Sequence, residues 1–227
     1  MVINDPSLCN IPFLDFPQQV QQLYDAGVRF FHLDIADGHY ADNLIFAPKI
    51  VGELRSRYPD SVLDVHLMVD DPAKYVPVLA DMGADYIAFH TDSTRFVVRT
   101  LDLIRKHGVK AGVCINPSQT IEHLEPFASE IDHLVFMSVE PGFPGQKFLP
   151  GAMPRFQALS EWKKAHGYDF MVIADGGITY DNLPELVQYG ADAVVTNIYT
   201  IFNQPDGIVS ACRRFDRFVA ELEQKNA

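Results

Sequence analysis

The chain has 227 residues, and its 48% hydrophobic and 21% charged residues are typical of a folded protein with a substantial core. Its 18 Lys and Arg residues stand against 30 Asp and Glu residues, which gives a formal net charge of −12. Because the sequence contains no cluster of basic residues, we expect neither nucleic acid nor an anionic membrane surface as a partner. A small anionic ligand would have to be held by local groups, because the net charge offers no positive potential.

The sequence shows no export or membrane signal. No apolar run approaches the ~20 residues of a membrane-spanning helix, and the first ten residues lack the basic start and apolar stretch of a signal peptide. Three cysteines, Cys9, Cys114 and Cys212, are widely spaced and form no C-x-x-C motif. These features predict a cytoplasmic protein with reduced thiols.

Short apolar runs alternate with longer amphipathic segments, which predicts strands followed by helices. The predicted strands cover residues 3–8, 28–35, 61–67, 85–90, 109–115, 131–137, 169–174 and 192–196. The predicted helices cover residues 16–26, 47–56, 72–82, 94–106, 119–127, 153–165, 181–189 and 207–223. Several helices end at a glycine, such as Gly27 and Gly83, which can adopt the left-handed conformation that closes a helix.

Eight strand–helix units predict a parallel sheet covered by helices. A closed sheet of this kind is a (β/α)₈ TIM barrel, and an open one is a doubly wound α/β fold. The count of eight, the absence of a G-x-G-x-x-G motif after the first strand, and a length near the typical ~250 residues favour the barrel. We therefore expect residues 1–227 to form a single TIM-barrel catalytic domain.

Polar side chains gather at the predicted strand ends, where TIM barrels carry their active sites. His32 and Asp34 lie two residues apart on the second strand, and Asp64 and His66 lie two apart on the third. Asp175 ends the seventh strand. A spacing of two places both side chains on one face of a strand. Two histidines and two aspartates suit Zn²⁺, Fe²⁺, Mn²⁺ or Co²⁺, and Asp64 could orient a ligating histidine from behind.

Asp34 and Asp175 come from opposite sides of the predicted barrel mouth, so they could face opposite sides of a substrate. One carboxylate would remove a proton and the other would return one, while a metal stabilises an enediolate. Each motif alone has a simpler explanation: H-x-D is usually a hydrogen-bonded strand end, Asp-Gly-Gly is usually a turn, and Met68 and Met137 would fill the core. The prediction depends on all of them reaching one mouth.

Five segments of the chain resemble the ribulose-phosphate 3-epimerase family in sequence and in order. They are residues 32–40 (HLDIADGHY), 63–69 (LDVHLMV), 116–117 (NP), 137–148 (MSVEPGFPGQKF) and 175–178 (DGGI). The resemblance covers essentially the whole chain. It implies a TIM barrel and an isomerase that epimerises C3 of a ketose phosphate, as in the conversion of ribulose 5-phosphate to xylulose 5-phosphate.

The resemblance also implies roles for individual residues. One divalent metal ion (Zn, Fe, Mn or Co) would be held by His32, Asp34, His66 and Asp175, and Asp34 and Asp175 would be the catalytic acid–base pair. Met68 would form, with Met137, an apolar wall that excludes water from the enediolate. The expected substrate-binding residues are Ser7, Asn10, His66, Met68, Met137, Gly142, Phe143, Pro144, Gly145, Gly176, Gly177, Asn197 and Ile198.

Three regions depart from the family pattern. Asn10 replaces the second hydroxyl of a Ser-x-x-Ser motif, and Ala36 replaces a methionine, which enlarges the predicted mouth. Asn197 and Ile198 stand in place of a Gly-Ser pair whose backbone N–H groups hold phosphate in the family. The changes at the first and eighth strands resemble the allulose-6-phosphate 3-epimerase branch, whose substrate is a ketohexose phosphate.

Phosphate could still be held by backbone groups of Gly145, Gly177 and Asn197. Two other functions stay open. A decarboxylase or aldolase on a related barrel would need a lysine at a strand end, and the sequence places none there. A non-catalytic sugar-phosphate binding protein would account for Asn10, Ala36 and Asn197, but it would not need all four potential metal ligands. The expected partner is a small sugar phosphate, and we expect a homo-oligomer.

Overall fold

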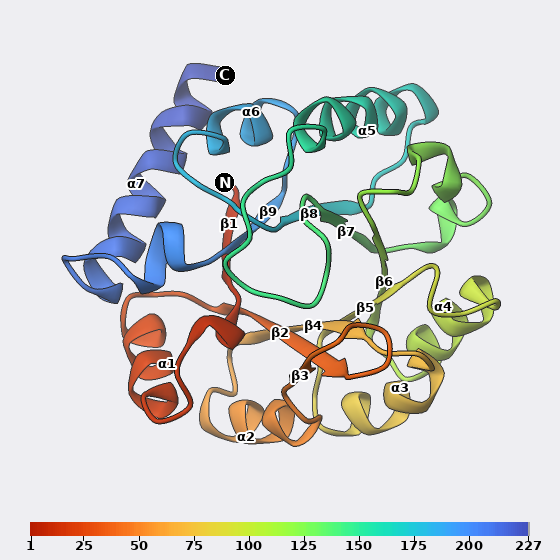
Figure 1. Cartoon of the computed structure of the whole chain (residues 1–227), viewed down its shortest axis with the longest axis horizontal. Helices are drawn as coiled ribbons and strands as arrows, with labels where there is room; N and C mark the ends of the chain where they lie inside the picture. The colour runs from red at the N-terminus through yellow and green to blue at the C-terminus, as the bar shows by residue number, and fades with distance from the viewer. Residues whose placement is uncertain (227) are drawn as a thin grey trace.

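The computed structural model describes residues 1–226, in which strands and helices alternate (Figure 1). The strands are β1 (Ile3–Pro6), β2 (Phe30–Asp37), β3 (Leu44–Ile45), β4 (Val62–Met68), β5 (Tyr86–His90), β6 (Lys110–Ile115), β7 (His133–Met137), β8 (Met171–Asp175) and β9 (Ala193–Thr196). The α-helices are α1 (Phe16–Asp25), α2 (Lys49–Arg57), α3 (Pro72–Asp81), α4 (Val97–Lys106), α5 (Ala152–His166), α6 (Leu183–Gln188) and α7 (Ile208–Asn226). Shorter turns are the 3₁₀ helices η1 (Leu8–Asn10), η2 (Ile121–Leu124) and η3 (Ala128–Glu130), and the π-helix η4 (Ile198–Phe202).

Within residues 1–226, eight parallel strands form a closed barrel. They pair in the order β1-β9-β8-β7-β6-β5-β4-β2, and a parallel bridge between Ser7 and His32 joins the end of β1 to β2. Figure 1 looks down this barrel, with the helices arranged around the ring of strands. The predicted (β/α)₈ fold class is confirmed, and the open doubly wound alternative does not apply.

The strand register brings the two polar motifs side by side. His32 on β2 pairs with Asp64 on β4, and Asp34 pairs with His66. Because alternate residues of a strand share a face, the two pairs enter the barrel interior at two successive levels. Asp175 ends β8 and therefore reaches the same end of the barrel as the upper pair. The fold thus gathers residues that are far apart in the sequence.

One predicted helix is wrong, and one short strand is not predicted. Residues 119–127 form 3₁₀ turns, in which the Phe127 N–H bonds the Leu124 carbonyl at 3.0 Å. Pro126 has no N–H to extend an α-helix, and buried apolar side chains recur here every third residue, beginning at Ile121. The strand β3, which pairs antiparallel with the end of β2, has two residues and therefore carries no periodic signal.

The interior of the barrel is only partly apolar. One large apolar cluster packs between the strands and the surrounding helices, and a smaller one fills the barrel from β5 to β9. Among residues 1–226, five aspartates and histidines are also fully buried, namely Asp5, His32, Asp64, His90 and His133. Burying such groups costs free energy unless they are paired. Their presence indicates that the barrel interior carries a functional site in addition to the apolar core.

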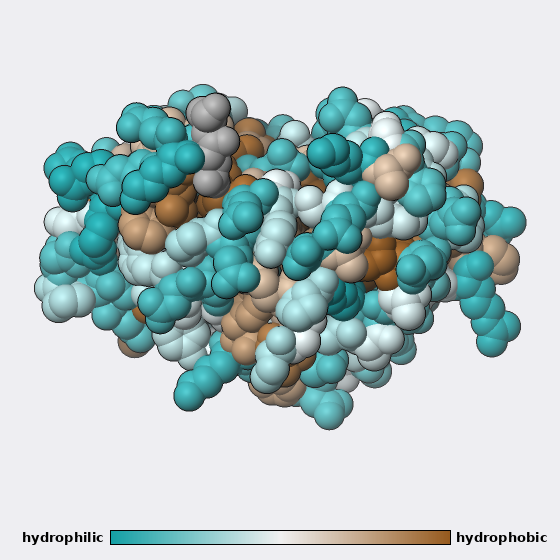
Figure 2. All heavy atoms as spheres, turned by 90° about the horizontal axis from the view of Figure 1, so that it is seen from above, coloured by the Kyte–Doolittle hydropathy of each residue, from teal (hydrophilic) through white to brown (hydrophobic). Residues whose placement is uncertain are grey.

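The outer surface is largely hydrophilic in the view of Figure 2, with small apolar areas between polar side chains. One apolar groove beside β3 is lined by Phe13, Leu44 and Phe46, among others. Within residues 1–226, no helix combines the length and apolar character that crossing a membrane requires.

We predict that Gly112→Ala destabilises the barrel. Gly112 of β6 pairs with His133 of β7, and a Cβ at Gly112 would lie 2.2 Å from the buried imidazole atom Cε1. Overpacking of this kind costs about 1–3 kcal/mol, so the urea unfolding midpoint should fall. Gly151→Ala is the control, because a Cβ there meets nothing within 4 Å among residues 1–226. Equal midpoints for the two variants would contradict this packing.

Candidate active site

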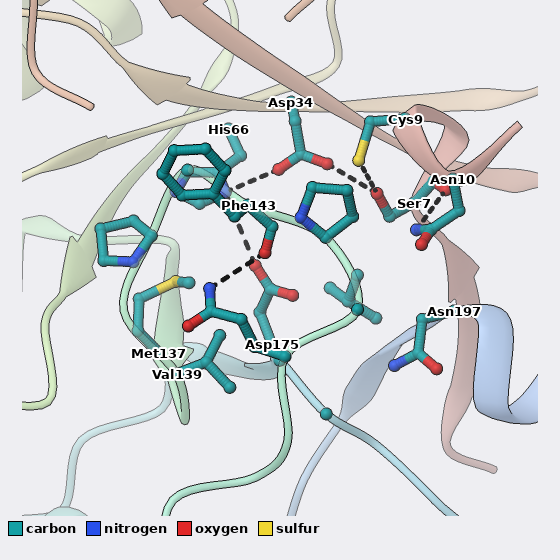
Figure 3. Close-up of a pocket in the computed structure, with 18 of the residues that line it drawn as sticks. Ser7, Cys9, Asn10, Asp34, His66, Met137, Val139, Phe143, Asp175 and Asn197 are labelled. Atoms are coloured by element: carbon teal, nitrogen blue, oxygen red, sulfur yellow. Dashed lines mark hydrogen bonds and ion pairs between the residues drawn. The ribbon is translucent and has the colours of Figure 1, made fainter. Parts of the chain in front are cut away.

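A cavity opens at the end of the barrel where β2, β4, β7, β8 and β9 terminate, and we call it the central cavity (Figure 3). Counted together with the open solvent at its mouth, the space between its lining atoms is about 520 Å³. The cavity is lined by Ser7, Cys9, Asn10, Asp34, Ile45, His66, Met68, Met137, Val139, Glu140, Pro141, Gly142, Phe143, Pro144, Gly145, Gln146, Asp175, Gly176, Gly177, Val195, Asn197 and Tyr199.

The central cavity contains the predicted site residues with two exceptions. His32 is fully buried and lies beside the cavity floor, against Asp34 and Asp175. Ile198 does not line the cavity, whereas Tyr199, the next residue, does.

Four ionisable side chains meet at the floor of the central cavity. His66 Nδ1 lies 3.1 Å from Asp34 Oδ1 and 3.6 Å from Asp175 Oδ2. His32 Nε2 lies 3.5 Å from Asp34 Oδ1 and 3.8 Å from Asp175 Oδ2. One ligand atom from each residue lies within 4.8 Å of those of the other three. Figure 3 shows Asp34 and Asp175 pointing toward one another across the cavity.

Carboxylates fix His32 from the side away from the cavity. Its Nδ1 hydrogen-bonds Asp64 Oδ2 at 2.8 Å and lies 3.6 Å from Asp5 Oδ2. This contact turns Nε2 toward Asp34 and Asp175. Burial alone would lower the pKa of His32, but the surrounding carboxylates, Asp34 above all, raise it well above its ordinary value. The cluster therefore favours a positive charge at Nε2, which a proton or a metal ion can supply.

The four residues fit a divalent metal ion. Two imidazole nitrogens and two carboxylates are ligand types that suit Zn, Fe, Mn and Co. His32 Nε2 is buried and has no hydrogen-bond partner among the described residues, so a metal would satisfy an otherwise unpaired atom. Asp64 behind His32 is the carboxylate partner that commonly orients a ligating histidine.

The two cavity carboxylates have pKa values shifted in opposite directions. Burial would raise the pKa of Asp34, but the attraction of the nearby His32 and the hydrogen bond to His66 hold that pKa well below its ordinary value. Burial raises the pKa of Asp175, and the negative charge of Asp34 adds to this increase against the attraction of His32. Asp34 is thus the stronger acid, and Asp175 keeps a proton more readily. Carboxyl groups separated in this way can serve as base and acid at one site.

The chain after β1 contributes a hydroxyl to Asp34. Ser7 Oγ donates to Asp34 Oδ2 at 2.6 Å, which leaves Oδ1 facing His66. Asn10 Nδ2 donates to the Ser7 carbonyl at 3.0 Å and so braces this turn. Cys9 Sγ lies 3.1 Å from Ser7 Oγ. The sequence around Cys9 does not predict this position at the cavity, and the other two cysteines are buried.

His90 of β5 supports His66 from the side. Their Nε2 atoms lie 2.8 Å apart, and both rings are buried. The ring of Tyr40 stacks on His90, with ring centroids 4.6 Å apart, and Asn116 Nδ2 donates to the Tyr40 hydroxyl at 2.7 Å. The loop after β2 is thereby connected to His66. A single histidine at a strand end does not reveal this link in the sequence.

Two loops meet beside the central cavity. Gly142, between β7 and α5, has a φ of +109°, and its carbonyl accepts a hydrogen bond from Asn43 Nδ2 at 2.7 Å. A Cβ at Gly142 would lie 2.6 Å from the Cβ of Ala41. Glycine is therefore required for both the backbone conformation and the close approach. The same loop brings Phe143 and Pro144 to the cavity wall.

The chain after β8 and β9 closes the other side of the cavity. Gly177 has a φ of +58°, and a Cβ there would lie 2.3 Å from the backbone nitrogen of Phe148. Tyr199 in η4 donates its hydroxyl to the Gly145 carbonyl at 2.7 Å. This bond ties η4 to the β7–α5 loop. The side chain of Asn197 lines the cavity on the same side (Figure 3).

Comparison with known proteins identifies the family of this chain. The model of the Ribulose-phosphate 3 epimerase family matches residues 3–201. The chain belongs to the ribulose-phosphate 3-epimerase family. The ribulose-phosphate 3-epimerase of Serratia marcescens is 36% identical, over 88% of this chain and 95% of that protein. The enzyme of the same name from Bacillus subtilis is 32% identical, over 88% of this chain and 92% of that protein. Membership of this family makes the chain an epimerase, which is an enzyme of the isomerase class.

Solved structures support the fold of this family member. KGPDC from Streptococcus mutans superimposes with a TM-score of 0.72 at 14% identity, over 98% of this chain and 99% of that chain. Phosphoribosyl anthranilate isomerase from Thermus thermophilus gives a TM-score of 0.65 at 16% identity, over 96% and 99%. At these identities the likeness shows a shared barrel, and it carries no argument about activity.

We predict that His90→Phe destabilises the metal-free protein by about 1–3 kcal/mol, because a buried imidazole nitrogen of His66 loses its hydrogen-bond partner. The phenyl ring keeps the volume and the stacking surface for Tyr40, so packing changes little. His90→Gln is the matched variant, because its amide can again bond His66. Urea unfolding in the presence of chelator measures the effect. If the Phe and Gln variants were equally stable, the 2.8 Å contact between His66 and His90 would not contribute to the free energy of unfolding.

Proposed function

We propose that the protein is a metal-dependent 3-epimerase of ketose phosphates, of the type that converts ribulose 5-phosphate to xylulose 5-phosphate. The observation that carries the proposal is the pair Asp34 and Asp175, which extend from strands on opposite sides of the barrel toward one point. Inverting a carbon centre by proton transfer requires a base on one face and an acid on the other. Family membership supports the same reaction class.

The proposed proton path uses the two carboxylates that point toward one another across the central cavity. Asp34, whose pKa is lowered, accepts the C3 proton of the ketose. The electron pair of the broken C3–H bond moves toward the C2 carbonyl oxygen and forms an enediolate. Asp175, whose pKa is raised, gives its proton to C3 from the opposite face. The product is the C3 epimer, and the reverse reaction exchanges the roles of the two carboxylates.

We propose that His32, Asp34, His66 and Asp175 hold one divalent metal ion. When bound there, such an ion supplies a positive charge that stabilises the oxygens of the enediolate. Ser7 holds Asp34 in place through its 2.6 Å hydrogen bond. Asp64 holds His32 in the same manner from behind.

Two methionines support this chemistry by excluding water. Met68 and Met137 line the central cavity from β4 and β7, and each is only 2% exposed. Apolar walls lower the local dielectric and strengthen the electrostatic stabilisation of a developing negative charge. The same walls protect the enediolate from protonation by solvent.

The proposed substrate is a pentose phosphate. Ala36, which suggests a wider mouth in the sequence, lines the groove beside β3 with Phe46 and does not line the central cavity. The smaller side chain therefore adds no room where the ketose would lie, so it gives no argument for a hexose phosphate.

We predict that Asp34→Asn and Asp175→Asn each reduce epimerisation by about 100-fold or more, because each removes one proton-transfer group. The measurement is deuterium exchange at C3 of ribulose 5-phosphate in D₂O, together with the formation of xylulose 5-phosphate. Asp181→Asn, at an exposed position, is the control for a lost carboxylate. If Asp34→Asn or Asp175→Asn epimerised at the native rate, the carboxylate removed in that variant would not be an acid–base group. Absence of exchange in the metal-replete wild type would refute the proposed reaction.

We also predict that chelation abolishes exchange and that one divalent ion per chain restores it. His66→Ala should lower the bound metal content, because it removes one of four ligands, and His107→Ala should not, because His107 is an exposed residue of helix α4's C-terminal turn. Elemental analysis after dialysis gives the metal content independently of activity. Full metal binding by the His66 variant would show that the ligand set is wrong.

A further inference from the structure

Asn197 presents a fixed amide group to the central cavity. The residue follows β9, is 8% exposed and lines the cavity. Its Oδ1 accepts a hydrogen bond from the Tyr199 N–H at 2.8 Å. Only an oxygen can accept this bond, so the orientation of the amide is determined. Nδ2 consequently faces the cavity (Figure 3), and it donates to no protein atom among the described residues.

The backbone N–H of Asn197 is already occupied. It donates to Thr200 Oγ1 at 3.0 Å, and the Asn197 carbonyl accepts from the N–H groups of Ile201 and Phe202 at 2.8 and 3.2 Å. The turn after β9 therefore satisfies its own backbone at this position. A ligand at this end of the cavity has the side-chain amide of Asn197 available to it, rather than the backbone N–H.

The charges around the cavity make this neutral donor important. Asp34, Glu140 and Asp175 line the cavity, and no Lys or Arg is among its described lining residues. The described lining residues therefore offer a phosphate dianion no Lys or Arg side chain to pair with. Neutral hydrogen-bond donors are the groups available to hold it. Besides the amide, the backbone N–H groups of Gly145 and Gly177 donate to no described protein atom.

We infer that Asn197 Nδ2 binds the phosphate group of the substrate and makes the enzyme selective for phosphorylated ketoses. The inference rests on the proposed epimerase function and adds a specificity-determining residue to it. Asn197 holds the phosphate by hydrogen bonding, while the reacting carbon lies at the Asp34–Asp175 end of the cavity. Selectivity thus depends on one side chain whose oxygen is fixed and whose NH₂ group is free.

The decisive variant is Asn197→Asp. Aspartate has the same shape and keeps an oxygen that accepts the Tyr199 N–H, since it caps such turns well. It replaces the NH₂ donor with a negatively charged oxygen. For ribulose 5-phosphate we expect KM to rise by about 30-fold or more with kcat within about threefold, because a charge–charge repulsion replaces a hydrogen bond far from the reacting carbon.

Thr200→Val is the matched control, because it disturbs the same turn from its other side. It removes the hydroxyl that accepts the Asn197 N–H and keeps Nδ2 in the cavity. We expect KM for ribulose 5-phosphate to stay within about threefold of the wild type. An equal increase in KM for Thr200→Val and Asn197→Asp would show that Asn197 only maintains the turn, and this would overturn the inference. An unchanged KM for Asn197→Asp would overturn it as well.

A second measurement does not depend on turnover. Inorganic phosphate binding to the metal-replete protein is measured by calorimetry, with neutral ribulose as the comparison ligand. Asn197→Asp should weaken phosphate binding by about 30-fold or more and change ribulose binding by less than about threefold. Equal losses for the two ligands would overturn the inference. If the wild type bound phosphate but showed no exchange at C3, the proposed reaction would fail while the role of Asn197 would stand.

Discussion

The structure depends on how the barrel keeps ionisable groups in its interior. Two buried side chains at the floor of the central cavity each have a hydrogen-bond partner on the neighbouring strand: Asp64 for His32, and His66 for Asp34. Removing one partner would leave a buried polar group without its hydrogen bond, which costs about 1–3 kcal/mol. The parallel register supplies these pairs, because neighbouring strands place His32 beside Asp64 and Asp34 beside His66. The strand register therefore also determines which ionisable side chains meet in the site.

This constraint explains what could be predicted from the sequence. Strand ends of a parallel barrel meet at one mouth, so a spacing of two was enough to place His32 with Asp34 and Asp64 with His66. The sequence-based set at the cavity floor was found together in space. The alternation of strands and helices predicted the barrel for the same reason, since it reflects the periodic burial of side chains.

The features that could not be predicted depend on contacts between distant loops. Tyr199 reaches Gly145, and Tyr40 stacks on His90, through turns whose shape has no periodic signal. The 3₁₀ turns around Pro126 replaced an expected helix, because Pro126 has no N–H and the buried side chains there recur every third residue. Ala36 was expected at the mouth, but the unpredicted strand β3 places it beside a separate groove. Each of these features lies in irregular backbone or in an element too short to have a periodic signal.

The closure of the barrel has a consequence for the order of folding. β1 pairs with β9, so Ile3 lies beside Ala193, and Ser7 reaches Asp34 from the end of β1. During synthesis, the first strand leaves the ribosome long before its partner exists. Contacts between such distant segments form late, because closing a long loop costs entropy before it brings any stabilisation. The Ser7–Asp34 hydrogen bond spans only 27 residues and can form early, so the late step is the β1–β9 pairing that closes the ring beside an already assembled β1–β2 edge.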